Sequence, residues 1–255
     1  MEPSPEPFTG LPAETSAEAP AEPPDQVHHH RDVRSGGARA AVFGMSDGLV
    51  TNVSLILGVA GAHPAAGVVR LTGLAGLVAG AFSMAAGEYV SMQAQRELLQ
   101  RELEVERQSL RRSPEAERRE LTAIYERRGV APELAAELVA EVMRDPEVAL
   151  ETHAREELGV DPAALGSPWQ AAISSFVTFA IGAFLPLLPW LFTAGTGATL
   201  ASVVIGAVAA LVVGGALGFF TGRSPVRSAL RQLGVAAVAA AVTYGIGRAV
   251  GAATG

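Results

Sequence analysis

Cysteine and lysine are both absent from this 255-residue chain, and aromatic residues make up only 5% of it. Without cysteine the chain can form neither disulfides nor thiolate metal sites, so oxygen, imidazole nitrogen or thioether sulfur would have to hold any metal. All nineteen basic residues are arginine, which together with abundant alanine and glycine suggests a GC-rich bacterial genome. There is no nucleophile triad or phosphate-binding loop, and the net charge of -7 gives no reason to expect a nucleic-acid partner.

Charge is missing from one long stretch, since residues 162–222 contain no Asp, Glu, Lys or Arg. A helix of roughly 20 apolar residues spans a bilayer core, so this stretch has room for two crossings and a turn. With 49% hydrophobic residues in the whole chain, the sequence predicts an all-α, polytopic membrane protein with five transmembrane helices. They are expected at residues 40–61, 67–93, 168–192, 197–220 and about 229–250.

Arginine placement predicts the orientation of these helices, because cytoplasmic loops of membrane proteins collect basic residues. Eleven arginines lie between residues 96 and 155, and others precede the first helix or follow the fourth. We therefore expect a multi-pass protein of the cell (plasma) membrane with its N-terminus in the cytoplasm. Four regions follow: a disordered acidic tail (1–38), transmembrane helices 1 and 2 (39–94), a cytoplasmic helical domain (95–166) and transmembrane helices 3 to 5 (167–255).

The tail is rich in Pro, Glu and Ala and lacks the apolar stretch of a signal peptide, so it is expected to remain disordered. His28, His29 and His30 could touch a metal. Three adjacent histidines on a disordered segment do not define a site, however, so a solvated polar tract is the favoured interpretation.

Acidic residues are concentrated in the cytoplasmic domain, where seventeen of the chain's 26 lie. Signals for helix starts at Ser113-Pro114, Ala131-Pro132 and Asp145-Pro146 predict helices joined by short turns. Gly159 is a natural end for the last of these helices. No breaker lies between residues 81 and 110, so the second transmembrane helix is expected to continue unbroken into this domain.

Some of these acidic residues are spaced to share a helix face, with Glu102 four residues from Glu106 and Glu117 three residues from Glu120. Carboxylates that converge are costly unless a cation binds between them, which favours a metal-binding domain. Arginines alternate with the acids, and a solvated face of ion pairs explains the spacing equally well. The candidate metal ligands are Glu102, Glu106, Glu117, Glu120, His153, Glu156 and Glu157.

Two acidic residues, Asp47 and Glu88, lie inside the predicted transmembrane helices. An ionisable group at membrane depth is costly and usually faces a pathway or a partner. Thr51 extends the polar face of Asp47 and Met84 lies one turn before Glu88, so these four are the candidate transport-pathway residues. Glu88 and Glu106 are eighteen residues apart, about five helical turns, and would share one face of an unbroken helix.

Four motifs resemble the vacuolar iron transporter family: GMSDGL at residues 44–49, GAFSMAAGEYVS at 80–91, REELG at 155–159 and PLLP at 186–189. The resemblance covers residues 38–250 in the family's order. It implies a homodimer of five-helix subunits in the lipid bilayer, with a pore between the subunits, that exchanges Fe²⁺ or Mn²⁺ for protons. We expect no enzymatic activity and no tightly bound cofactor, with Fe²⁺ or Mn²⁺ as the substrate and as the ion at the cytoplasmic site.

The resemblance places the family's pore aspartate at Asp47 and its pore methionine at Met84. Its cytoplasmic glutamates correspond to Glu102, Glu106, Glu117, Glu120 and Glu157. This chain departs from the family in having Gly76 where plant members have a glutamate, Ser109 at another glutamate position, and His153-Ala154 in place of a methionine pair. These departures leave the metal preference and stoichiometry open.

The predicted function is transport of Fe²⁺, or alternatively Mn²⁺, out of the cytoplasm. Two other functions stay open. A membrane-anchored di-iron ferroxidase would also need clustered glutamates, although Leu150 stands where the usual Glu-x-x-His motif has its glutamate. A membrane metal sensor would bind metal through residues 95–161 without transporting it.

Overall fold

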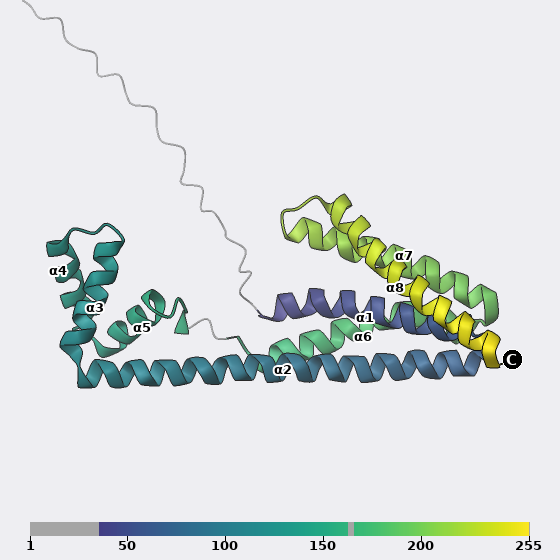
Figure 1. Ribbon diagram of the computed structural model, residues 1–255, viewed down its shortest axis with the longest axis horizontal. Coiled ribbons are helices and arrows are strands. Elements are labelled where there is room, and N and C mark those ends of the chain that lie inside the picture. Colours follow the sequence, from purple (N-terminus) through teal and green to yellow (C-terminus); the bar gives the residue numbers. More distant parts are fainter. Residues whose placement is uncertain (1–35, 163–165, 255) are drawn as a thin grey trace, which may run out of the picture. The chain divides into compact units, whose positions relative to one another are not determined.

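The computed structural model describes residues 36–162 and 166–254, which form eight α-helices and no strand (Figure 1). Five helices are long and apolar enough to cross a membrane, which confirms the prediction from composition. The predicted tail lies outside the described residues, His28 to His30 included, except for its last three residues, which begin the first helix. In chain order the helices are α1 Gly36–Gly61, α2 Ala66–Arg112, α3 Pro114–Arg127, α4 Pro132–Val142, α5 Pro146–Glu156, α6 Pro168–Phe192, α7 Gly195–Phe220 and α8 Pro225–Thr254.

The turns between the apolar helices lie at the predicted breaks. Gly195 and Gly222 have φ of 65° and 67°, a left-handed conformation that glycine adopts without strain. The outer bounds differ from the prediction, because α7 begins two residues earlier and α8 is longer at both ends than residues 229–250. Helical hydrogen bonding continues past the apolar residues until a turn interrupts it, so the helices are longer than their hydrophobic segments.

The most extensive packing in the described chain is between α1 and α6. A Cβ atom at Gly48 would overlap the Phe179 carbonyl group, and one at Gly182 would overlap the Met45 carbonyl. Small residues therefore allow the two backbones to touch, as is common between helices in membranes. These two helices are also the most deeply buried of the five, whereas α8 is the least buried.

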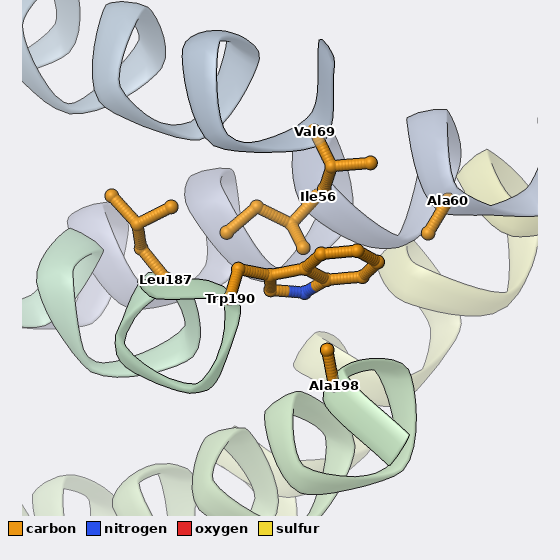
Figure 2. Packing of buried hydrophobic residues seen from close by; sticks show 6 residues of the cluster. All are labelled: Ile56, Ala60, Val69, Leu187, Trp190 and Ala198. Atoms are coloured by element: carbon orange, nitrogen blue, oxygen red, sulfur yellow. The ribbon is translucent and has the colours of Figure 1, made fainter. Parts of the chain in front are cut away.

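One buried cluster ties four of the apolar helices together at the end where α1 turns into α2. Figure 2 shows Trp190 of α6 lying among Ile56 of α1, Val69 of α2, Leu187 of α6 and Ala198 of α7. Each of these side chains is at most 3% exposed. The cluster fixes the relative positions of the four helices at this end of the bundle.

The second helix runs without a break for 47 residues, as predicted from the absence of a breaker. At 1.5 Å per residue it is roughly 70 Å long, more than twice the thickness of a bilayer core. Its apolar N-terminal part packs on α1 and α6, and its glutamate-rich C-terminal part contacts α3 and α5. One rigid element thus carries residues of both the apolar bundle and the acidic region.

The short helices begin where the sequence predicts. Asp145 caps α5, since its carboxylate accepts hydrogen bonds from Glu147 N at 2.9 Å and Val148 N at 3.3 Å. Ser113 occupies the corresponding position of α3 but its hydroxyl makes no capping hydrogen bond. The last of the short helices, α5, ends at Glu156, and Gly159 follows in the left-handed conformation with φ of 65°.

Candidate metal centre

Three helices bring four potential metal ligands together in the acidic region. They are Glu106 of α2, Glu117 of α3, and His153 and Glu157 at the end of α5. One ligand atom from each side chain can be chosen so that all four lie within 4.8 Å of one another. Because α3 and α5 both contact α2, residues up to 51 positions apart in the sequence meet at one point.

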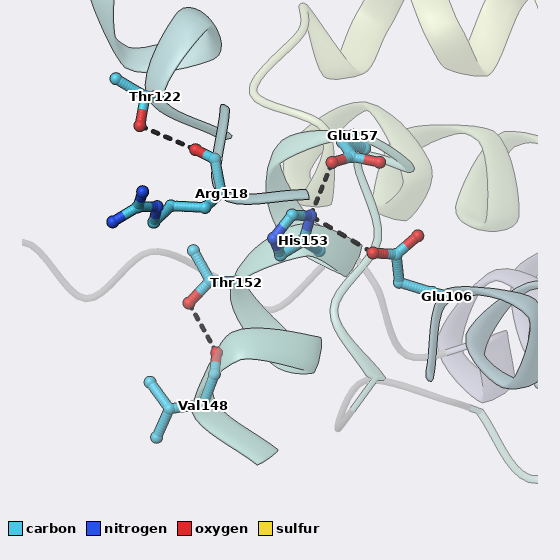
Figure 3. A network of polar contacts seen from close by, with 7 residues as sticks. All are labelled: Glu106, Arg118, Thr122, Val148, Thr152, His153 and Glu157. Atoms are coloured by element: carbon cyan, nitrogen blue, oxygen red, sulfur yellow. Dashed lines mark hydrogen bonds and ion pairs between the residues drawn. The ribbon is translucent and has the colours of Figure 1, made fainter. Parts of the chain in front are cut away.

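His153 lies at the middle of this cluster and is fully buried. Its Nδ1 atom is 2.7 Å from Glu157 Oε1 and 3.3 Å from Glu106 Oε1, as Figure 3 shows. Ionised carboxylates only accept hydrogen bonds, so in the metal-free arrangement Nδ1 is the nitrogen that carries hydrogen. The other nitrogen, Nε2, is buried and has no hydrogen-bond partner, which is costly for a polar atom and marks an incomplete site.

The electrostatics of the cluster oppose the presence of so many carboxylates without a cation. Burial, followed by the charge of Glu157, raises the pKa of Glu106 above its usual value, while His153 acts in the opposite direction. Burial is also the main cause that raises the pKa of Glu117, and Glu120 and Glu157 add to it. A divalent cation bound among these oxygens would remove this penalty.

The ion pairs of the arginines bear on the two interpretations of the glutamate spacing. Ion pairs at 2.5–3.1 Å join arginines to exposed glutamates outside the cluster, as Arg107 pairs with Glu104 and Arg155 with Glu151. Among the described residues, no arginine forms an ion pair with any of the four cluster members. The solvated face of ion pairs therefore exists, but the cluster is separate from it.

Three predicted ligands lie outside this group of four. Glu156 pairs with Arg128 and with the Tyr125 hydroxyl, on the side of α5 that faces the end of α3. Neighbouring residues of a helix point about 100° apart, so Glu156 and Glu157 cannot both face the same point. Glu120 is exposed yet close enough for its charge to raise the pKa of Glu106. Glu102 is half-buried one turn before Glu106.

No pattern in the sequence indicates the partners of Glu156. Burial and the charge of Glu156 raise the pKa of the Tyr125 hydroxyl, and Arg128 opposes this effect. The Glu156 side chain is only 16% exposed, so its charge needs the arginine. This contact holds the start of the α3–α4 turn against α5, the helix that carries His153 and Glu157.

The four predicted pathway residues lie on α1 and α2. Asp47 is exposed and accepts a hydrogen bond from the Thr51 hydroxyl at 3.3 Å. Met84 is half-buried and packs beside Ala81 and Phe179, and Glu88 is half-buried one turn further along. In the described chain, neither Asp47 nor Glu88 belongs to a group of three or more potential ligands.

Gly76, the position at which the sequence departs from plant members, faces the inside of the chain. A Cβ atom there would overlap the Leu55 side chain and lie 3.0 Å from Asn52 Oδ1. Asn52 is fully buried and donates from Nδ2 to the Ala183 carbonyl at 2.6 Å, while its Oδ1 has no hydrogen-bond partner. There is no space for a glutamate at residue 76 in this arrangement.

The donor set of the cluster is one imidazole nitrogen and the oxygens of three carboxylates. Oxygen donors suit Mg²⁺, Ca²⁺ and Mn²⁺, whereas imidazole suits Fe²⁺ and Zn²⁺. A mixed set of this kind fits a first-row divalent transition metal. The crowded carboxylates, and the buried Oε1 atom of Glu106 that has no hydrogen-bond partner, are the features of this structure that such an ion would satisfy.

Comparison with known proteins gives consistent similarities over nearly the whole chain. A profile of the VIT family matches residues 38–248. "Vacuolar iron transporter 1" of Oryza sativa subsp. japonica is 34% identical over 227 residues, 88% of this chain and 90% of that protein. The protein of the same name from Arabidopsis thaliana is 31% identical over 226 residues, again 88% and 90%. "Vacuolar iron transporter" of Acanthamoeba castellanii is 35% identical over 219 residues, 84% of this chain and 78% of that protein.

Proposed function

The chain belongs to the VIT family, and from that premise we propose that it moves Fe²⁺, or alternatively Mn²⁺, out of the cytoplasm in exchange for protons. Relatives of this chain are named as iron transporters, and the chain is a multi-pass membrane protein and not an enzyme. The names of the relatives refer to the vacuole. For a bacterial chain the corresponding site is the plasma membrane, with residues 95–166 on the cytoplasmic side.

The observation that carries the proposal is the position of the four-ligand cluster on the continuous helix α2. Glu106 of the cluster and Glu88 of the apolar segment are eighteen residues apart, about 27 Å along one face of the helix. A metal held by the cluster would therefore lie in line with the polar face that enters the membrane. This arrangement suits a domain that collects metal and delivers it to a pathway.

The chemistry of each step follows from the residues. Cytoplasmic carboxylates and His153 gather the ion, and the thioether of Met84 favours a borderline ion such as Fe²⁺ over Mg²⁺ or Ca²⁺. Asp47 is the acidic residue that would replace part of the ion's water inside the membrane. Protons compete with metal for the same carboxylates, so a proton gradient can drive release on the opposite side.

We further propose that two copies of the chain form the transport pathway between them. Asp47 is exposed in the single chain although α1 is one of the two most buried helices. A charged group on the outside of a membrane bundle is costly unless a partner or water covers it. A homodimer that places Asp47 and Met84 at its axis would satisfy this requirement.

A flux experiment tests the proposal. Proteoliposomes loaded with a metal-sensitive dye would be given Fe²⁺ under anaerobic conditions, with and without a pH gradient, for the wild type, Asp47→Ala and Glu106→Gln. Wild-type uptake is expected to depend on the gradient. Asp47→Ala should abolish flux while metal binding persists, and Glu106→Gln should weaken both. Glu104→Gln, a neighbouring exposed glutamate outside the cluster, is the matched control.

The outcomes separate the alternatives. If Asp47→Ala transports as well as the wild type, the pathway assignment is wrong. Metal binding by the wild type without any flux would identify a membrane metal sensor. Oxygen consumption that accompanies Fe²⁺ addition would identify a ferroxidase. The same assay with Mn²⁺, Co²⁺ and Zn²⁺ establishes the preferred ion.

A further inference from the structure

Three arginines that form no ion pair with the described residues lie in the turn before α8 and in its first turns. The sequence has no aspartate or glutamate after Asp161, so Arg223, Arg227 and Arg231 have no carboxylate nearby in the chain. All three are exposed, and none forms an ion pair with any residue that the structure describes. Their charge is therefore available to a ligand.

The packing of α8 on α7, two helices that lie side by side in Figure 1, determines which face of α8 points away from the bundle. Gly214 and Gly218 of α7 allow close contact with Pro225, Ser228, Ala229 and Gln232 of α8. At 100° per residue, the contacting residues share one face of α8. Arg227 and Arg231 lie roughly 150° and 110° around the axis from the centre of that face. They are on the outward side of the helix.

The turn before α8 holds the first arginine in place. Arg223 N donates to the Gly218 carbonyl at 2.9 Å, and Gly222 takes the left-handed conformation that such a helix end requires. Ser224 Oγ accepts from Arg227 N at 3.4 Å at the start of α8. The backbone of the arginine group is thus ordered on both sides of the turn.

Helix length places the group at the surface of the membrane. With 30 residues α8 is about 45 Å long, whereas a bilayer core is about 30 Å thick. Residues 234–253 are enough to cross the core and contain a single charged residue, Arg248. The first nine residues of α8 then lie among the headgroups, with Arg227 and Arg231 in that segment.

The same outward face becomes apolar further along the helix. Val238 lies eleven residues after Arg227, and Val242 eleven after Arg231, which is close to three full turns. These valines are 66% and 57% exposed. One continuous stripe of α8 therefore presents guanidinium groups at the headgroup level and aliphatic side chains at the level of the acyl chains.

We infer that this stripe is a binding site for an anionic phospholipid of the surrounding bilayer. The guanidinium groups of Arg223, Arg227 and Arg231 hold the phosphate and the net negative charge of the headgroup by charge-assisted hydrogen bonds. The acyl chains lie along Val238 and Val242. The site is separate from the metal centre and does not depend on the transport function.

A lipid fits this surface better than a second copy of the chain. A protein partner would have to supply carboxylates at the edge of the membrane to neutralise three arginines. Within the five transmembrane segments that the sequence predicts, the only acidic residues are Asp47 and Glu88. Anionic phospholipids supply both the negative charge and the apolar chains that the stripe requires.

Native mass spectrometry of the full chain, released from detergent with phosphatidylglycerol or phosphatidylcholine, tests the inference. The wild type is expected to retain phosphatidylglycerol in preference to phosphatidylcholine, and added salt should weaken this preference. Each guanidinium near the membrane surface contributes roughly a fivefold gain in affinity for an anionic lipid. The Arg→Gln change at all three positions should therefore weaken phosphatidylglycerol binding about a hundredfold. The matched control neutralises three exposed arginines of the acidic region, Arg112, Arg119 and Arg127, and should retain the lipid.

Because arginines also orient membrane helices, the single variants R223Q, R227Q and R231Q are measured alongside the triple variant, with about a fivefold loss expected for each. Unchanged lipid preference in these variants would overturn the inference. So would a loss of dimer mass without a loss of lipid, which would show that a second copy covers the stripe. The inference also fails if the preference appears only when residues 1–32 are removed, since the acidic tail would then be the occupant.

Discussion

Replacing Glu106 with glutamine is expected to stabilise the metal-free protein and to reduce the stabilisation that bound metal adds. The side chain is 13% exposed, and its neighbours in the cluster include the carboxylates of Glu117 and Glu157. Burial and Glu157 raise the pKa of Glu106, so the ionised form is disfavoured in the folded protein. Glutamine keeps the size and the hydrogen-bonding ability of the side chain and removes only its charge.

The size of the effect follows from the geometry. Two unit charges at the 4.8 Å limit of the cluster repel by about 3.5 kcal/mol at an effective dielectric constant of 20. Solvent and His153 reduce this repulsion, so we expect Glu106→Gln to stabilise the metal-free protein by about 1–2 kcal/mol. For a chain of this size that corresponds to roughly 2–8 °C in the unfolding temperature.

The effect on metal binding has the opposite sign. Even groups that only support a metal ligand are worth roughly 10–100-fold in affinity, so losing a ligand should cost at least about tenfold. A tenfold loss reduces the stabilisation by bound metal by about 1.4 kcal/mol at saturating metal. The metal-induced rise in unfolding temperature should therefore shrink in the variant.

Tryptophan fluorescence of the detergent-solubilised protein during heating, with and without anaerobic Fe²⁺, measures both quantities. Glu104→Gln is the matched control, because hydrogen bonds from Gln108 and Arg107 lower the pKa of Glu104, and because Glu104 is not a member of the cluster. Neutralising Glu104 should not stabilise the protein and should leave the metal effect intact. The reasoning is refuted if Glu106→Gln lowers the unfolding temperature of the metal-free protein and leaves the metal-induced rise unchanged.

Three further perturbations test the pH dependence, the helix packing and the capping. The pKa of Glu117 in the folded protein lies above its usual value of 4.5, so the folded state binds more protons than the unfolded state and its stability falls as pH rises above 4.5. This fall, measured without metal as the unfolding temperature against pH, should be smaller in Glu117→Gln. Gly48→Ala should destabilise the protein by about 1–3 kcal/mol through the α1–α6 contact. In the same melting assay Gly87→Ala should be neutral or slightly stabilising, because no atom lies within 4 Å of the added carbon. Equal effects of the two changes would contradict the packing argument. Asp145→Ala removes the cap of α5, so it should lower the free energy of unfolding by about 1 kcal/mol and weaken Fe²⁺ binding. Ser113→Ala should change neither quantity, because the Ser113 hydroxyl makes no capping hydrogen bond. Fe²⁺ titrations that give the same affinity for both variants would rule out the role of the cap.

The membrane helices could be predicted because their signals are local. Hydropathy, together with Pro and Gly at the breaks, is read over a few neighbouring residues, and the bilayer sets the required helix length. The unbroken course of α2 also follows from a local property, the absence of a breaker between residues 81 and 110. The predicted start of α7 and both predicted ends of α8 are less accurate, because a helix continues beyond its apolar residues until a turn stops it.

The candidate site could be predicted only in part. Spacing on single helices nominated seven ligands, and it could not separate Glu157, which contacts His153, from Glu156, which pairs with Arg128. That difference depends on which neighbouring helix each residue faces. The signal that the sequence did contain was a histidine among glutamates, and His153 is the residue at the centre of the cluster.

By itself, the sequence determined the class of the protein, the number of apolar helices and the family to which they belong, because composition, breakers and motifs are properties of neighbouring residues. Only the tertiary structure decided which of seventeen acidic residues form a cluster and which form ion pairs with arginine. The physical reason is that α3 and α5 fold back onto α2, so that Glu106, Glu117, His153 and Glu157 meet while most of the intervening glutamates face solvent. Charge alone is a property of the sequence, whereas the distance between charges is a property of the fold.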